Sequence, residues 1–207
     1  MRAVRPTVRA ILPAPLLLAL LCSPHIAQAQ RGAITAHRNL AEITEAAANI
    51  IEGAVVSARV EPHPTLNNLQ TVVVTVRVAR TLKGPASRSF EFRQLIWDIR
   101  DRADNGGYRR GEHLLLFMNR PSAYGLSSPI GLEQGRFRIM GDRGRGFMAI
   151  NGQANAALLK GVAPRLEAAQ AQMPTQLKRL VQTHQHGPIR LDDLSQLVLL
   201  LQFERSK

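Results

Sequence analysis

The chain of 207 residues contains a single cysteine, Cys22, in an N-terminal segment that we expect to be removed. Without that cysteine the protein has no disulfide, thiol nucleophile, CxxC redox motif or cysteine metal ligand. An exported protein without disulfides depends on its hydrophobic core for stability. This suits a bacterial periplasm and argues against a small disulfide-rich scaffold. Leu21 directly before Cys22 is larger than the residue that a lipobox requires, so we do not expect a lipoprotein.

Aromatic residues are also scarce, at 4% of the chain, which argues against a platform for stacking nucleic-acid bases. Acidic residues are outnumbered, with 15 Asp and Glu against 27 Lys and Arg, so the formal net charge is +12. Such a charge can attract nucleic acid, anionic lipid or acidic polymers. Because the arginines are dispersed along the chain, a generally basic composition is favoured over a nucleic-acid footprint.

The sequence has no G-x-S-x-G nucleophile elbow, no HExxH metal motif and no phosphate-binding loop. His184 and His186 could offer two imidazoles to a metal, but the sequence shows no third and fourth ligand. Asp98, Asp101 and Asp104 have the wrong spacing for an EF-hand calcium loop. We therefore expect a protein that is not an enzyme and that holds no metal or other cofactor.

The first 29 residues are typical of a Sec-type signal peptide. Its positively charged start contains Arg2, Arg5 and Arg9. An apolar run over residues 11–21 follows, and it is shorter than the roughly 20 residues of a membrane-spanning helix. Ala27-Gln28-Ala29 suits signal peptidase, so we expect cleavage between Ala29 and Gln30. The mature protein is then periplasmic or secreted, without an integral membrane span, and residues 30–38 form a flexible leader.

The hydrophobic pattern predicts a mainly β protein with flanking helices. Asn39 and Glu42 have the spacing of a capping box and predict a helix from residue 40. Val74 and Val76 belong to an alternating strand whose other face carries Arg77, and Gly53 indicates a bulge. The six predicted strands lie at residues 50–60, 71–84, 88–95, 113–119, 136–140 and 147–151.

We expect residues 39–152 to form a small OB-type β-barrel of about six strands, because closure removes the exposed edges of so few strands. Periodicity alone leaves a β-sandwich as the alternative. Residues 153–207 are predicted to form a helical extension, interrupted at Pro174, that docks on the barrel. The apolar side of its last helix comprises Leu191, Leu194, Val198 and Leu201. A membrane-surface or partner-binding helix is less favoured, because its polar face lacks Lys and Arg.

The segment SSPIGLEQGRFRIMGDRGRGF, residues 127–147, combines glycines with arginines. Its glycines lead into a strand and not into a helix, which indicates a β-hairpin and not a phosphate loop. Alternation with Phe137 and Ile139 predicts that the strand arginines share the outer face. The expected partner-binding patch comprises Arg136, Arg138, Arg143 and Arg145. Such a patch suits a carboxylate-rich or phosphate-rich partner, and a charged edge that only maintains solubility is the alternative.

Four segments suggest a family by their order along the chain: NIIEGAVVSARV, TVVVTVRVARTLKG, RRGEHLLLFMN and SAYGLSSPIGLEQGRFRI. Together they resemble a group of exported bacterial proteins of unknown function. The resemblance covers residues 40–151 and LDDLSQLV near the end. It implies an OB-type barrel, similar to netrin-like modules and tissue inhibitors of metalloproteinases. It also implies a gene that lies near genes for matrixin-like zinc proteases. It implies no catalytic residues, and the mature chain lacks the N-terminal cysteine with which tissue inhibitors bind the protease zinc.

The sequence therefore predicts an exported, non-enzymatic interaction module. Its expected partner is a protein in the envelope or outside the cell, and a secreted metalloprotease is one candidate. The alternative is an OB-type barrel that binds nucleic acid or another polyanion. Its surface arginines would be Arg77, Arg93, Arg136, Arg138, Arg143 and Arg145.

Overall fold

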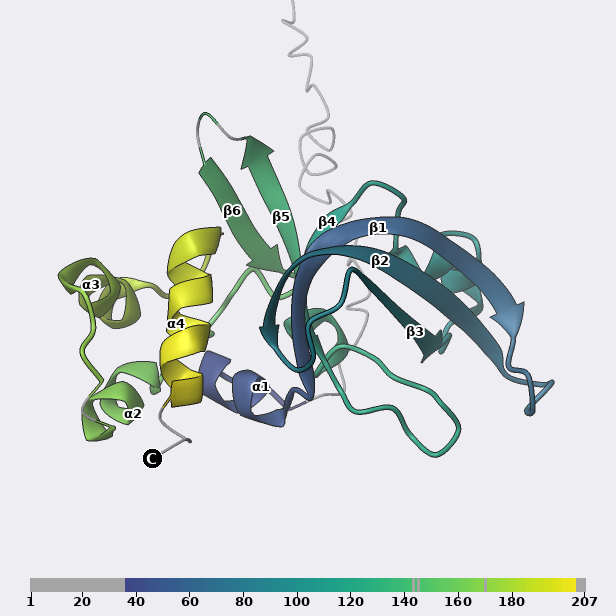
Figure 1. Cartoon of the computed structure of the whole chain (residues 1–207), viewed down its shortest axis with the longest axis horizontal. Helices are drawn as coiled ribbons and strands as arrows, with labels where there is room; N and C mark the ends of the chain where they lie inside the picture. Colours follow the sequence, from purple (N-terminus) through teal and green to yellow (C-terminus); the bar gives the residue numbers. More distant parts are fainter. Residues whose placement is uncertain (1–35, 143, 145, 170, 204–207) are drawn as a thin grey trace, which may run out of the picture. The chain divides into compact units, whose positions relative to one another are not determined.

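The computed structural model describes residues 36–203 apart from residues 143, 145 and 170. The predicted signal peptide and most of the predicted leader lie outside these residues. The described part contains a seven-stranded antiparallel sheet and four α-helices (Figure 1), which confirms the mainly β architecture with flanking helices. No helix in this part of the chain is long and apolar enough to cross a membrane.

The sheet has the strand order β3-β2-β1-β4-β5-β6-β7. Its strands are β1 (Asn49–Pro62), β2 (Gln70–Lys83), β3 (Ser89–Leu95), β4 (His113–Met118), β5 (Arg136–Asp142), β6 (Gly146–Asn151) and β7 (Ile189–Arg190). The α-helices are α1 (Leu40–Ala46), α2 (Val162–Ala168), α3 (Thr175–Thr183) and α4 (Leu191–Phe203). Short 3-10 helices are η1 (Ile99–Arg102), η2 (Asn105–Gly107) and η3 (Leu132–Gln134). The six predicted strands correspond to β1–β6, whereas β7 has only two residues and was too short for its periodicity to be recognised.

Two local predictions are confirmed at the start of the fold. The Asn39 side chain accepts a hydrogen bond from the Glu42 amide at 3.0 Å, and the Glu42 carboxylate accepts one from the Asn39 amide at 2.8 Å. This capping box satisfies exposed amides at the start of α1. In β1 the register with β2 shifts between Glu52 and Gly53. A Cβ atom at Gly53 would lie 2.3 Å from the Arg77 carbonyl oxygen, so no side chain fits at this bulge.

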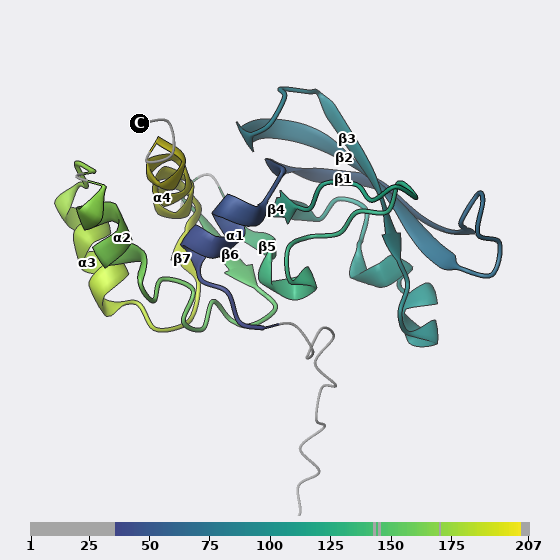
Figure 2. The ribbon, with the colours of Figure 1, turned by 90° about the horizontal axis from the view of Figure 1, so that it is seen from below.

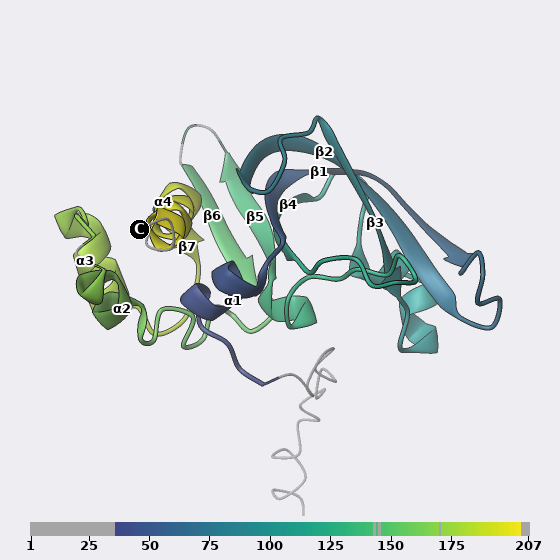
Figure 3. The same cartoon turned by 60° about the horizontal axis from the view of Figure 1, so that its bottom comes forward.

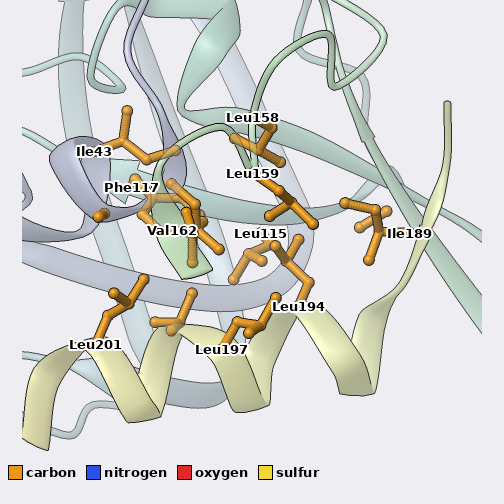
Figure 4. Packing of buried hydrophobic residues seen from close by; sticks show 14 of the residues in the cluster. Ile43, Leu115, Phe117, Leu158, Leu159, Val162, Ile189, Leu194, Leu197 and Leu201 are labelled. Carbon is orange, nitrogen blue, oxygen red and sulfur yellow. The ribbon is translucent and has the colours of Figure 1, made fainter. Parts of the chain in front are cut away.

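The sheet separates two hydrophobic clusters, and neighbouring strand residues alternate between them. Ile50 and Leu115 belong to the cluster shared with the helices, which we call the helix-side core. Ile51 and Leu114 belong to the cluster on the opposite face, which we call the strand-side core. Figure 4 shows the helix-side core between the sheet and α4. The strand-side core comprises Ile51, Val55, Val72, Val74, Val76, Phe92, Tyr108, Leu114, Leu116 and Met118.

The predicted valine strand behaves as expected. Val74 and Val76 are fully buried, and Arg77, on the opposite face of β2, is exposed. The predicted C-terminal helix is also confirmed, because α4 buries Leu191, Leu194, Val198 and Leu201. Pro174 stands at the N-cap of α3 and separates it from α2, as the sequence indicated. β7 pairs with β6 directly before α4 begins (Figure 2), which places this helix against the sheet.

The strand order is open, because the described parts of β3 and β7 lie at opposite ends of the sheet. The long strands β1 and β2 nevertheless curve strongly (Figure 3), and one loop connects the two edges of this curved part. Leu126 forms an isolated bridge with Arg93 of β3, and Pro129 forms one with Met118 of β4. The Ser127 amide also donates to the Arg93 carbonyl at 2.8 Å. Closure of a barrel by paired strands is not seen in these residues and stays a prediction.

Candidate functional site

The glycine- and arginine-rich segment forms the predicted hairpin of β5 and β6. Their antiparallel register runs from Phe137 opposite Asn151 to Asp142 opposite Gly146. Gly141 and Gly146 have φ angles of +111° and +86°, a conformation that side chains disfavour. A Cβ atom on Gly141 would also lie 2.3 Å from the Gly146 carbonyl oxygen. The glycines therefore serve the hairpin and not a phosphate-binding loop.

The two faces of this hairpin have different environments. Ile139 and Ala149 lie opposite each other and face the helix-side core. The neighbouring pairs project to the other side, where β7 adds a residue opposite Met148. We call this opposite surface the hairpin face, and it comprises Arg138, Met140, Met148, Ile150 and Arg190. In Figure 1, α4 lies beside β6, on the side of the hairpin that is buried.

The hairpin face combines accessible apolar and cationic side chains. Met140 is 48% exposed, and Met148 and Ile150 are half-buried. The Arg138 and Arg190 side chains are both 57% exposed. Methionine adapts its shape to a contacting surface, and both methionine and arginine are enriched in protein interfaces. This composition makes the hairpin face the strongest candidate for a binding surface in the described residues.

Each exposed arginine of the hairpin face has an acidic neighbour that is more deeply buried. Arg138 Nε lies 3.3 Å from a Glu112 carboxylate oxygen, and Arg190 Nε lies 4.0 Å from one of Asp193. The Glu112 and Asp193 side chains are only 17% and 14% exposed. The guanidinium groups therefore face the solvent more than the carboxylates do, and the charge presented outward is positive.

The prediction that Arg136 lies on the surface is wrong. Its side chain is 3% exposed and forms an ion pair with Glu133, with Nη2 2.8 Å from the carboxylate oxygen. Nη1 donates to the Gly106 carbonyl at 3.2 Å, and the guanidinium carbon lies 4.7 Å from the centre of the Tyr108 ring. Arg136 does share a strand face with Arg138, as alternation predicted, but η2 and Tyr108 cover that end of the strand.

Tyr108 completes this buried contact. Its hydroxyl donates to the Gln94 side-chain oxygen at 2.8 Å, and burial raises the pKa of Tyr108 to about 12. The phenol is therefore neutral at physiological pH and provides an aromatic surface for Arg136. Arg136 thus joins β5 to the loop before β4 and is a structural residue. Arg143 and Arg145, the two loop members of the predicted patch, lie outside the described residues.

The arginines of the polyanion alternative do not form one continuous surface in the part that the structure describes. Arg93 on β3 donates to Glu61 at 2.6 Å and to the Thr71 hydroxyl at 2.8 Å. Arg77 on β2 is exposed, but β1 and β4 separate its strand from β5. Arg138 is the described member of that set that belongs to the hairpin face.

Among the described residues, no group of three or more His, Cys, Asp or Glu side chains is placed to hold a metal ion. His184 caps the end of α3, and burial, together with nearby His186, lowers the pKa of its imidazole. Asp98 caps η1 by accepting from the Arg100 amide at 2.9 Å. Asp104 similarly accepts from the Gly107 amide at 3.1 Å, so these carboxylates stabilise a loop.

Sequence reasoning missed a partly buried polar cluster between the sheet and α4. Glu52 accepts a hydrogen bond from Arg80 Nε at 2.9 Å and lies 3.3 Å from His113 Nε2. Arg80 Nη2 also donates to the Ser195 hydroxyl at 2.7 Å. Burial by itself raises the pKa of Glu52, but the His113 hydrogen bond and the Arg80 charge hold it below its usual value. Since Ser195 contacts a guanidinium and not a base, this cluster attaches α4 to the sheet and does not activate a nucleophile.

Comparisons with known proteins neither support nor contradict these observations. No family model matches the chain, and comparison with curated proteins and with solved structures also gave no match. The family resemblance therefore stays a prediction. The hairpin face is the feature from which a function is inferred.

Proposed function

We propose that this chain is an exported, non-enzymatic interaction module that binds a protein partner through the hairpin face. One observation carries the proposal: the accessible side chains of Met140, Met148 and Ile150, which we call the apolar row, share one face with two outward arginines on β5 and β7. The predicted cleavage between Ala29 and Gln30 supports a location in the periplasm or outside the cell.

The hairpin face is held in shape before any partner arrives. Behind Met140 and Met148, the residues Ile139 and Ala149 are buried in the helix-side core. A preformed surface loses less conformational entropy on binding, which favours affinity. Its methionine side chains can still adjust to a partner because their thioethers are flexible. The surface is thus rigid in its backbone and adaptable in its side chains.

The finer family assignment belongs to the same proposal. We propose an OB-type, netrin-like architecture for residues 39–152, with a secreted matrixin-like protease as one candidate partner. The curvature of β1 and β2 and the bridges from Leu126 and Pro129 to β3 and β4 support this architecture. The protein would not inhibit such a protease by zinc chelation through an N-terminal cysteine, because its predicted mature form has none.

Site-specific photocrosslinking tests the proposal in the organism that encodes the chain. Met140 is replaced by p-benzoylphenylalanine, and Trp97, which is 77% exposed just after β3, serves as the matched control position. We expect irradiation to join one discrete protein to the Met140 variant and not to the Trp97 variant. Identical products from both positions, or none from Met140, would refute the proposed function.

Polyanion binding is the alternative, and the outward charge of Arg138 and Arg190 is the observation that favours it. Affinity for duplex DNA would fall with the logarithm of salt concentration, with a slope of about 0.9 for each phosphate neutralised. The apolar row would contribute little to such binding. Met140→Ser should therefore leave DNA binding unchanged but weaken protein binding, which separates the two functions in one pair of titrations.

A further inference from the structure

We infer that the partner presents an apolar ridge flanked on both sides by carboxylates. This inference rests on the proposed function and names the chemistry of its partner. Met140 and Met148 face each other across the hairpin, and Arg190 stands opposite Met148 on the next strand. Arg138 borders the same row through its pairing with Ile150. Arg138 on β5 and Arg190 on β7 therefore lie on either side of β6. Met148 and Ile150 occupy β6 between them, and Met140 lies beside Arg138 on β5.

The charge distribution favours acidic groups on the partner. Glu112 and Asp193 pair with the two arginines but neutralise only part of their outward charge, because the exposed fraction of each arginine is more than three times that of its acidic neighbour. Arginine donates two parallel hydrogen bonds to one carboxylate, so each guanidinium can hold a partner's Asp or Glu. The chain's net charge of +12 also attracts an acidic partner over longer distances.

The apolar row favours a polypeptide over a nucleic acid. Phosphate contacts would use Arg138 and Arg190 but would leave Met140 and the half-buried Met148 and Ile150 facing a polar backbone. A peptide or protein surface with Leu, Ile, Phe or Met at its centre removes these side chains from water. The two kinds of side chain should affect different rate constants. The exposed arginines should mainly set the association rate, and the apolar contacts should mainly set the dissociation rate.

A display library of random twelve-residue peptides tests this chemistry without knowledge of the natural partner. Selection uses the purified protein, with subtraction against the variant Arg138→Gln, Met140→Ser, Arg190→Gln. We expect the enriched peptides to contain a central Leu, Ile, Phe or Met with Asp or Glu on both sides. Thermal melts of the two proteins should agree within a few degrees, because all three changes lie at exposed positions.

The rates of a selected peptide then test the role of each group. Arg138→Gln with Arg190→Gln should slow association about tenfold at low salt and flatten its salt dependence. Met140→Ser should instead accelerate dissociation with little change in association. The matched control is Arg59→Gln with Arg77→Gln, two exposed arginines outside the hairpin face whose replacement removes the same net charge. This control should reduce association far less.

Each outcome decides between occupants. Enrichment of basic or uncharged peptides would overturn the inference, as would a failure to enrich any peptide over the subtracted variant. Displacement of the peptides by duplex DNA, with no effect of Met140→Ser, would assign the surface to a polyanion. Dimerisation of the chain that Met140→Ser abolishes would assign it to a second copy. If basic or uncharged peptides are enriched, or if no peptide is enriched, a discrete crosslink from position 140 would still uphold the proposed function.

Discussion

Arg136 and Arg138 occupy the same face of β5 two residues apart, yet we expect their replacement to have very different effects. Arg136→Gln removes an ion pair with Glu133, a charged hydrogen bond to the Gly106 carbonyl and a contact with the Tyr108 ring. Loss of one partner from a buried pair costs about 3–5 kcal/mol of unfolding free energy. Arg138→Gln removes one exposed ion pair, which is worth about 0–1 kcal/mol.

Urea unfolding of the purified variants, followed by circular dichroism, measures both free energies. For a domain of this size the Arg136→Gln loss corresponds to a fall in melting temperature of about 10 °C. Adding Glu133→Gln to Arg136→Gln should recover part of the loss, because it removes the carboxylate left without its partner. Equal effects of Arg136→Gln and Arg138→Gln, or a change below about 0.5 kcal/mol for Arg136→Gln, would show that Arg136 is not a buried anchor.

Three further expectations follow from the fold and the sequence. Val74→Asp should unfold the domain, because it places an unpaired charge in the strand-side core, whereas Arg77→Gln should be nearly neutral; equal thermal melts would contradict the β2 assignment. Glu52 has a lowered pKa, so its stabilising contribution is present above its ordinary value of 4.5 and is lost as the pH falls through its folded value. Glu52→Gln should therefore weaken the acid dependence of urea unfolding between neutral pH and about pH 3, and an unchanged dependence would refute this assignment. The intact mass of the exported protein should correspond to cleavage between Ala29 and Gln30, and a product that retains the N-terminal arginines would contradict the signal peptide.

The sequence alone determined those features that depend on neighbouring residues. The capping box at Asn39 and Glu42 lies within four residues, and its side chains can only reach the amides at the start of one helix. Alternation placed Val74 in the core and Arg77 outside, because successive strand residues face opposite sides. The hairpin was predictable for the same reason, since its glycines stand where the backbone turns.

Only the tertiary structure decided what covers each face. Alternation correctly placed Arg136 and Arg138 on one side of β5, but it carried no information on Tyr108, which arrives from the loop before β4 and buries only the first of them. The contact between Arg80 and Ser195 likewise joins β2 to the last helix. Backbone geometry is set by residues close in sequence, whereas burial and ion pairing depend on segments that meet only after the chain has folded.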